Sequence, residues 1–110
     1  MQEQIQTLLE AIKADYLRFT SRNGTRELTE INKRMIDEFN AKLRFEVGRK
    51  YIKVIAGSGV WGFIQIEGDK KFQAGAILKA AGWNAPARNK PRGNIFNDLS
   101  WVQWTGPAYL

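Results

Sequence analysis

The stretch Tyr51–Glu67, Y-I-K-V-I-A-G-S-G-V-W-G-F-I-Q-I-E, decides the fold. Two runs rich in β-branched and aromatic residues flank Gly57-Ser58-Gly59, a pattern that is typical of a β-hairpin. Because alternate residues of a strand lie on opposite faces, we expect helices to cover one face of the hairpin and the other face to be aromatic and partly open. Gly62, inside the second run, indicates a bulge or a close backbone approach. The run R-F-E-V before Gly48 predicts a further strand.

The chain before this hairpin carries two apolar stripes with helical spacing. The first stripe predicts one helix and consists of Ile5, Leu8, Leu9, Ile12, Tyr16 and Phe19. The second predicts another helix and consists of Leu28, Ile31, Met35, Ile36, Phe39 and Leu43. Between them Asn23-Gly24 can reverse the chain, and Thr25 or Thr29 is a suitable N-cap for the second helix. We expect the stripes to face each other or to cover one side of a sheet.

The chain after the hairpin is harder to assign. The run Q-A-G-A-I-L-K-A-A-G fits a short strand or a short helix, and we favour the strand because it would extend the sheet. The run L-S-W-V-Q-W predicts a last strand. The fold class is therefore α+β, with an N-terminal helical hairpin packed on a small antiparallel β-sheet of three to five strands. We expect a single domain over 1–110, with the two helices in 1–43 and the sheet in 44–110.

The amino-acid composition argues against several kinds of catalytic and metal site. The chain has 110 residues, of which 44% are hydrophobic and 12% aromatic, enough for one modest core. It contains no cysteine and no histidine, which argues against disulfides, thiolate nucleophiles, the common zinc sites and histidine acid–base catalysis. The acids Glu46, Glu67 and Asp69 are too scattered to suggest a catalytic pair, and Asp69 fits a turn. We therefore expect no enzyme activity and no cofactor.

The start of the chain and its apolar runs bear on location. M-Q-E-Q-I-Q lacks the basic and apolar regions of a signal peptide, and no apolar run approaches the roughly 20 residues of a membrane helix. We therefore expect a soluble protein that does not bind to membranes.

The net charge of +6 is concentrated in one segment. Between Lys70 and Asn97 lie six of the 17 cations and no acid, and the other 11 cations balance the 11 acids elsewhere. We call 70–97 the basic segment. Within it, 81–96 (A-G-W-N-A-P-A-R-N-K-P-R-G-N-I-F) predicts an irregular loop rich in Pro, Gly and Asn. A focused cationic surface attracts anionic partners such as nucleic acid or an acidic protein.

The basic segment supplies the candidate binding residues. They are Lys70, Lys71, Lys79, Trp83, Asn84, Arg88, Asn89, Lys90, Arg92 and Asn94. The cations would neutralise phosphates, the asparagines would reach sugar or base edges, and Trp83 would stack on a base. The alternative is an ordered surface loop in which Trp83 fills the core, and the two interpretations of Trp83 are about equally well supported.

A second set of residues could form a stacking platform on the open face of the sheet. Its members are Tyr51, Trp61, Phe63, Trp101, Trp104 and Tyr109. Cross-strand aromatic pairs that fill a small core are the favoured interpretation of this set.

Three motifs fall within residues 50–96. They are K-Y-I-K-V-I, then V-W-G-F-I followed by G-D, then I-L-K-A-A-G-W-N-A-P-A-R-N-K-P-R-G-N-I-F. Together they resemble small proteins encoded by tailed bacteriophages, which carry a Lys-Tyr-x-Lys strand, a Gly-Asp turn and a Trp-x-x-Pro-Ala segment ending in Arg-Gly-Asn. The resemblance does not extend over the helices. It implies a phage origin and a host-cell setting, and it implies no activity and no site residues.

Two functions remain in competition. The first is an accessory protein that binds nucleic acid, single-stranded DNA or RNA rather than duplex, through the basic, Trp-containing loop. The second is a protein-interaction module, either an inhibitor of an acidic host protein or a small virion component. The host cytoplasm is the expected location, with the virion as the alternative. Exposed strand edges in so small a sheet would also allow a homo-oligomer to form.

Overall fold

The computed structural model describes residues 2–22, 24–25, 27–88 and 90–106. Helices α1 (Gln2–Ser21) and α2 (Glu30–Lys42) come first. A five-stranded antiparallel sheet follows in the order β1-β2-β3-β4-β7, and its strands are β1 (Leu43–Val47), β2 (Tyr51–Ala56), β3 (Gly59–Gln65), β4 (Ala76–Leu78) and β7 (Gly93–Asn94). Strands β5 (Ala80–Gly82) and β6 (Ala85–Pro86) form a separate two-stranded sheet. The α+β prediction is therefore confirmed, as is the strand favoured after Phe72.

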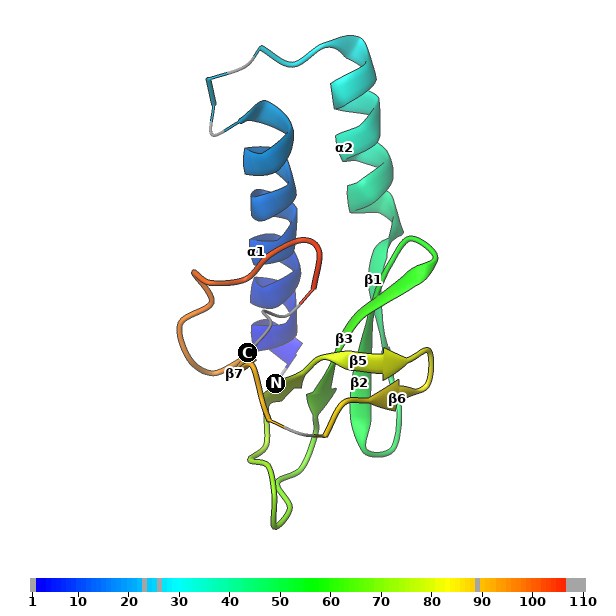
Figure 1. The fold of residues 1–110 in the computed structure, drawn as a ribbon, viewed down its shortest axis with the longest axis vertical. Coiled ribbons are helices and arrows are strands. Elements are labelled where there is room, and N and C mark those ends of the chain that lie inside the picture. The colour runs from blue at the N-terminus through cyan, green and yellow to red at the C-terminus, as the bar shows by residue number, and fades with distance from the viewer. Residues whose placement is uncertain (1, 23, 26, 89, 107–110) are drawn as a thin grey trace.

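The two helices stand side by side at one end of an elongated molecule that measures 48 × 25 × 24 Å (Figure 1). The predicted stripe of α1 is buried from Ile5 to Tyr16, but Phe19 is 64% exposed. The stripe of α2 packs less well, since Ile31 is 69% exposed and Asn32 is the one residue of α2 that is fully buried. Phe19 and Ile31 are exposed because the end of α1 and the start of α2 project beyond the sheet (Figure 1).

Helix α2 begins directly after Thr29, one of its two predicted N-caps. The Thr29 side chain accepts a hydrogen bond from the Asn32 amide at 3.2 Å. The Asn32 side chain accepts in return from the Thr29 amide at 3.3 Å. This reciprocal capping satisfies two backbone donors that a helix start otherwise leaves without partners.

A bulge in β3 assigns the aromatic residues to two faces. Val54 pairs with Gly62 while Ile55 pairs with Val60, so Trp61 is an extra residue in β3. Trp61 therefore joins the core between α1 and the sheet, together with residues such as Leu8 and Ile64. The bulge predicted at Gly62 is confirmed by this register shift.

The second face of the sheet also carries a core, which the sequence led us to expect as partly open. Phe63, Phe72, Ala76 and Leu78 are all buried there. Ala80 of β5 packs against them, and β5 contacts β3. The β5–β6 hairpin thus lies on this second face (Figure 1). The predicted irregular loop 81–96 is in fact partly regular, because it contains β6 and β7.

The predicted last strand is wrong. Within 98–106, which we call the C-terminal segment, the only ladder contact is an isolated bridge between Gln103 and Gly106. The segment instead spans the two layers. The Trp61 indole N–H donates to the Gln103 carbonyl at 2.8 Å, and the Trp104 amide donates to the Asp15 carboxylate at 2.9 Å. These long-range partners take the backbone groups that a strand ladder would have used.

Neither α1 nor α2, the two helices of the described residues, is long and apolar enough to cross a membrane.

Candidate nucleic-acid interface

The tip of the β5–β6 hairpin presents an aromatic ring and an amide side by side. Trp83 and Asn84 form the turn between the two strands. Lys53 of β2 holds both, since its Nζ atom donates to the Asn84 Oδ1 atom at 2.7 Å and lies 4.8 Å from the centre of the Trp83 ring. Trp83 remains 48% exposed, so it does not fill the core. A two-residue turn anchored by one lysine therefore keeps an aromatic surface in solvent.

Arg88 is half-buried, and its side chain has several partners. Its guanidinium donates to the Asp69 carboxylate at 2.8 Å, to the Gln65 side chain at 3.3 Å and to the Tyr51 hydroxyl. It also stacks over the Phe72 ring at 4.6 Å. Arg88 thus connects the hairpin to the loop between β3 and β4, and these contacts occupy the donors that a phosphate would need.

Asp69 is the acid at the centre of this network. Its Oδ1 atom accepts from the backbone amides of Phe72 at 2.8 Å and Lys71 at 2.9 Å, which confirms its role as a turn residue. The amide of Phe72 and then that of Lys71 lower the pKa of Asp69 well below its usual range, and Arg88 lowers this pKa further. The carboxylate therefore stays ionised and keeps Arg88 in place.

Two other predicted residues have structural partners. The Asn94 side chain donates to the Ala74 carbonyl at 2.9 Å and accepts from the Phe96 amide at 3.0 Å. The Arg92 amide donates to the Ile77 carbonyl at 2.8 Å, and its guanidinium donates to the Lys90 carbonyl. Asn94 and Arg92 thereby hold the chain around β7 against β4. Asn89 lies outside the described residues.

The remaining predicted cations are not all at one place. Lys70 and Lys71 are exposed in the connection between β3 and β4. Figure 1 shows this connection at the lower end of the molecule, while the β5–β6 hairpin lies higher and to the side. Lys79, between β4 and β5, is half-buried, and Lys90 is exposed. The structure therefore brings Trp83 and Asn84 together and separates them from Lys70 and Lys71.

A small hollow beside the hairpin tip contains residues that the sequence did not single out. We call it the tip pocket; it has a volume of about 260 Å³ and is lined by Glu46, Val47, Gly48, Arg49, Lys50, Tyr51, Lys53, Phe63 and Asn84. Three of these residues are cations and one is an acid. The alternation K-Y-I-K was the available signal, because it places Lys53 and Tyr51 on one face of a strand.

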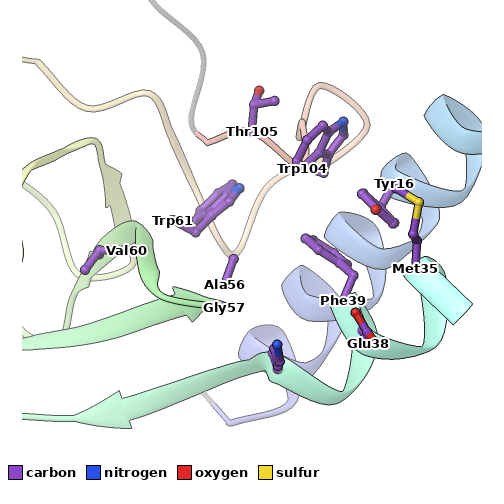
Figure 2. A pocket seen from close by; sticks show the side chains of 12 residues that line it. Tyr16, Met35, Glu38, Phe39, Ala56, Gly57, Val60, Trp61, Trp104 and Thr105 are labelled. Atoms are coloured by element: carbon purple, nitrogen blue, oxygen red, sulfur yellow. The ribbon is translucent and has the colours of Figure 1, made fainter.

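A second hollow lies between the helices and the sheet. This apolar groove has a volume of about 520 Å³, and Figure 2 shows Tyr16, Phe39, Trp61 and Trp104 around it. Tyr16 and Phe39 stack with ring centres 4.1 Å apart, and Trp104 meets the Tyr16 ring edge-on at 5.0 Å.

The proposed stacking platform is not one surface. Trp61 faces the helices whereas Phe63 lies in the opposite core, and both are only 3% exposed. Tyr51 meets the Phe63 ring edge-on at 5.9 Å, which is the cross-strand core pairing that we favoured. Tyr109 lies outside the described residues.

Comparison with known proteins adds a family and no activity. Neither the curated proteins nor the solved structures give a match. Among the described residues, no group of three or more acids could hold a metal ion. One family model matches residues 1–109, which include both helices and the whole sheet. On that match, the chain belongs to the family of unknown function DUF7717.

Proposed function

We propose that this protein is a phage-encoded accessory protein that binds single-stranded nucleic acid in the host cytoplasm. The observation that carries the proposal is Trp83, which stands 48% exposed at a hairpin tip with Lys53 and Asn84 beside it. Tryptophan is highly buried on average, so a half-exposed ring is a candidate contact surface, and a base offers it a flat partner. The cations beside the hairpin tip, Arg49, Lys50 and Lys53, support the same partner class through their charge.

The arrangement favours single strands over duplex. A base can stack on Trp83 only when it is unpaired and unstacked, and that condition is met in single strands, loops and ends. Lysine and arginine around the tip would contact the phosphates without reading sequence. We therefore expect strong dependence on salt and weak dependence on sequence.

The test is a titration of fluorescent single-stranded DNA, single-stranded RNA and duplex DNA between about 50 and 200 mM salt. We expect both single strands to bind more tightly than duplex, with affinity falling steeply as salt rises. Trp83→Ala should weaken binding by about 1 to 3 kcal/mol, the usual contribution of one stacked base. Trp101→Phe, at a half-buried position in the C-terminal segment, is the matched aromatic control and should leave binding unchanged. Absence of binding at low salt would remove the proposal.

A second candidate function has an observation of its own. Leu17, Phe19, Ile31 and Met35 are large apolar side chains exposed at the helical end of the molecule, and Met35 lines the apolar groove. Helical segments of partner proteins commonly lay an apolar face into such a groove. The hollow that adjoins the groove at Met35 and Trp104 is lined by Arg18 and Arg22.

These features favour an amphipathic helix of an acidic host or virion protein as the occupant. Arg18 forms an ion pair with Asp15 at 3.3 Å, which leaves the cations Arg22 and Lys42 against the acid Glu38 along the two hollows. Met35→Glu tests this interaction, because it places a charge in the groove while Trp83 stays intact. A protein that the wild type captures from nuclease-treated lysate and the variant loses would support this second function. Equal capture by both proteins would exclude the groove as the docking site.

A further inference from the structure

We propose that the tip pocket is a phosphate subsite, which takes the phosphate of the nucleotide whose base stacks on Trp83. This inference rests on the proposed function and adds to it a location and a ligand group. The pocket lies between the turn that joins β1 to β2 and the tip of the β5–β6 hairpin. Residues from 46–53, Phe63 of β3 and Asn84 of the hairpin line it, so three separate parts of the chain build it.

The charges of the pocket suit an anion. Arg49, Lys50 and Lys53 line it, and the only acid of the lining is Glu46. Glu46 is 3.7 Å from the guanidinium of Arg44, which offsets its charge. The Lys50 ammonium group forms an ion pair with the Asp69 carboxylate at 3.7 Å. Arg49 makes no ion pair with any residue that the structure describes. Arg49 and Lys53 are thus the cations best placed for a phosphate.

Lys53 connects the pocket to the aromatic ring. Lys53 lines the pocket, and its ammonium group donates to Asn84 and lies 4.8 Å from the Trp83 ring centre. Because Lys53 lies beside both Trp83 and the pocket, we expect a base stacked on Trp83 to bring its own phosphate toward the pocket. Asn84 and the aromatic residues Tyr51 and Phe63 also line the pocket, as expected for a nucleotide with charged and apolar parts.

The size of the pocket limits its occupant. Its volume of about 260 Å³ lies just below the roughly 300 to 1,000 Å³ of pockets that enclose drug-sized ligands. One phosphate with its sugar fits that scale. The phosphate could be internal to a strand, with one negative charge, or terminal, with about 1.5 to 2 negative charges at pH 7.

The experiment compares Arg49→Gln with Arg34→Gln. Arg34 is exposed on α2 away from the tip pocket, so the two variants lose the same charge at different places. The probe is a 3′-labelled oligothymidine with or without a 5′-phosphate. We expect Arg49→Gln to weaken binding about five- to tenfold at low salt and to reduce the salt slope by about one phosphate. Arg34→Gln should change affinity less than twofold.

The outcomes separate this inference from the proposed function. Tighter binding of the 5′-phosphorylated strand by the wild type, lost in Arg49→Gln, assigns the pocket to a terminal phosphate. An equal loss with both strands assigns it to an internal phosphate. Equal behaviour of the two variants, with wild-type binding intact, would overturn the subsite and leave the proposed function standing. Failure of the wild type to bind either strand would overturn both.

Discussion

Arg88 and Lys53 have the same charge, and both hold the β5–β6 hairpin, but Lys53 does so at its exposed tip. Arg88 bonds to Asp69, Gln65 and Tyr51, and so fixes the hairpin to the body of the protein. Lys53 belongs to the body and reaches out to hold the hairpin tip. Composition alone placed Arg88 in the binding set and left Lys53 out of it. At the scale of one residue, the contacts a cation already makes decide whether it is free for a ligand.

Arg88→Ala should therefore reduce stability. The change removes hydrogen bonds within a partly buried network and the stacking on Phe72, which leaves Asp69 and Gln65 with fewer partners. We expect the melting temperature to fall by about 5 °C or more. Lys70→Ala is the matched control, since Lys70 is exposed in the neighbouring loop, and it should shift the melting temperature by about 2 °C at most. Equal melting temperatures for the two variants would show that Arg88 is not structural.

The same network predicts that the stability of the protein falls at low pH. Because the pKa of Asp69 is lower in the folded state than in the unfolded chain, its contribution to stability is complete above about pH 4. It is lost as the pH falls below that value toward the folded-state pKa. Thermal unfolding of the wild type and Asp69→Asn should be compared from about pH 2 to pH 6. The gap between their melting temperatures should narrow as the pH falls, and a constant gap would contradict this assignment.

At the scale of elements, the pairing of β4 with β7 depends on Gly75. Its φ of +85° lies in the left-handed region, and a Cβ atom there would stand 2.7 Å from both Asn94 Oδ1 and the Phe96 ring. The Gly75 amide and carbonyl also bond to Gln65 at 2.7 Å and Ile95 at 3.0 Å. Gly75 thus lets the chain turn into β4 and leaves room for the Asn94 and Phe96 side chains beside it.

Gly75→Ala should lower the free energy of unfolding by about 1 to 3 kcal/mol, from backbone strain and the collision with Asn94 and Phe96. Gly82→Ala is the matched control, because Gly82 is exposed and a Cβ atom there would meet nothing within 4 Å. Urea unfolding measures both changes. A loss in Gly82→Ala as large as that in Gly75→Ala would contradict the role of the left-handed turn.

For the whole molecule, the C-terminal segment joins the helical layer to the sheet. Its Trp104 contacts Tyr16 and Phe19 of α1 and Phe39 of α2, with ring centres 5.0, 5.2 and 6.0 Å apart. Its backbone bonds to Asp15 of α1 and to Trp61 of β3. Residues distant in sequence therefore share one aromatic cluster, which adds to the core that α1 already forms with the sheet.

Trp104→Ala should lower the free energy of unfolding by about 2 to 3 kcal/mol, less than for a fully buried tryptophan because Trp104 is half-buried. Trp83→Ala removes the same side chain from an exposed site and should cost less than about 1 kcal/mol, the scale of its contact with Lys53. Urea unfolding of the two variants makes the comparison. If Trp83→Ala were the more destabilising change, Trp83 would be structural and the proposed base contact would lose its support.

Local pattern was enough for much of the fold. The helical spacing from Ile5 to Tyr16, the turn at Gly57 and the cap at Thr29 each depend on neighbours within a few residues. Such features act over one turn of helix or one pair of strands, so the sequence alone predicted them. The candidate site was predicted only in part. Trp83 and Asn84 were named, while Arg49, Lys50 and Lys53 were not.

What the sequence by itself determined is therefore the two helices, the strands up to β4, the α+β class and the concentration of positive charge between Lys70 and Asn97. Only the tertiary structure decided which cations are already engaged, which aromatic rings are buried, and that L-S-W-V-Q-W spans two layers in place of a last strand. The physical reason is the separation in sequence between the residues that determine each feature. Periodicity follows from backbone geometry between near neighbours, whereas an ion pair or a pocket depends on side chains that folding brings together from distant positions.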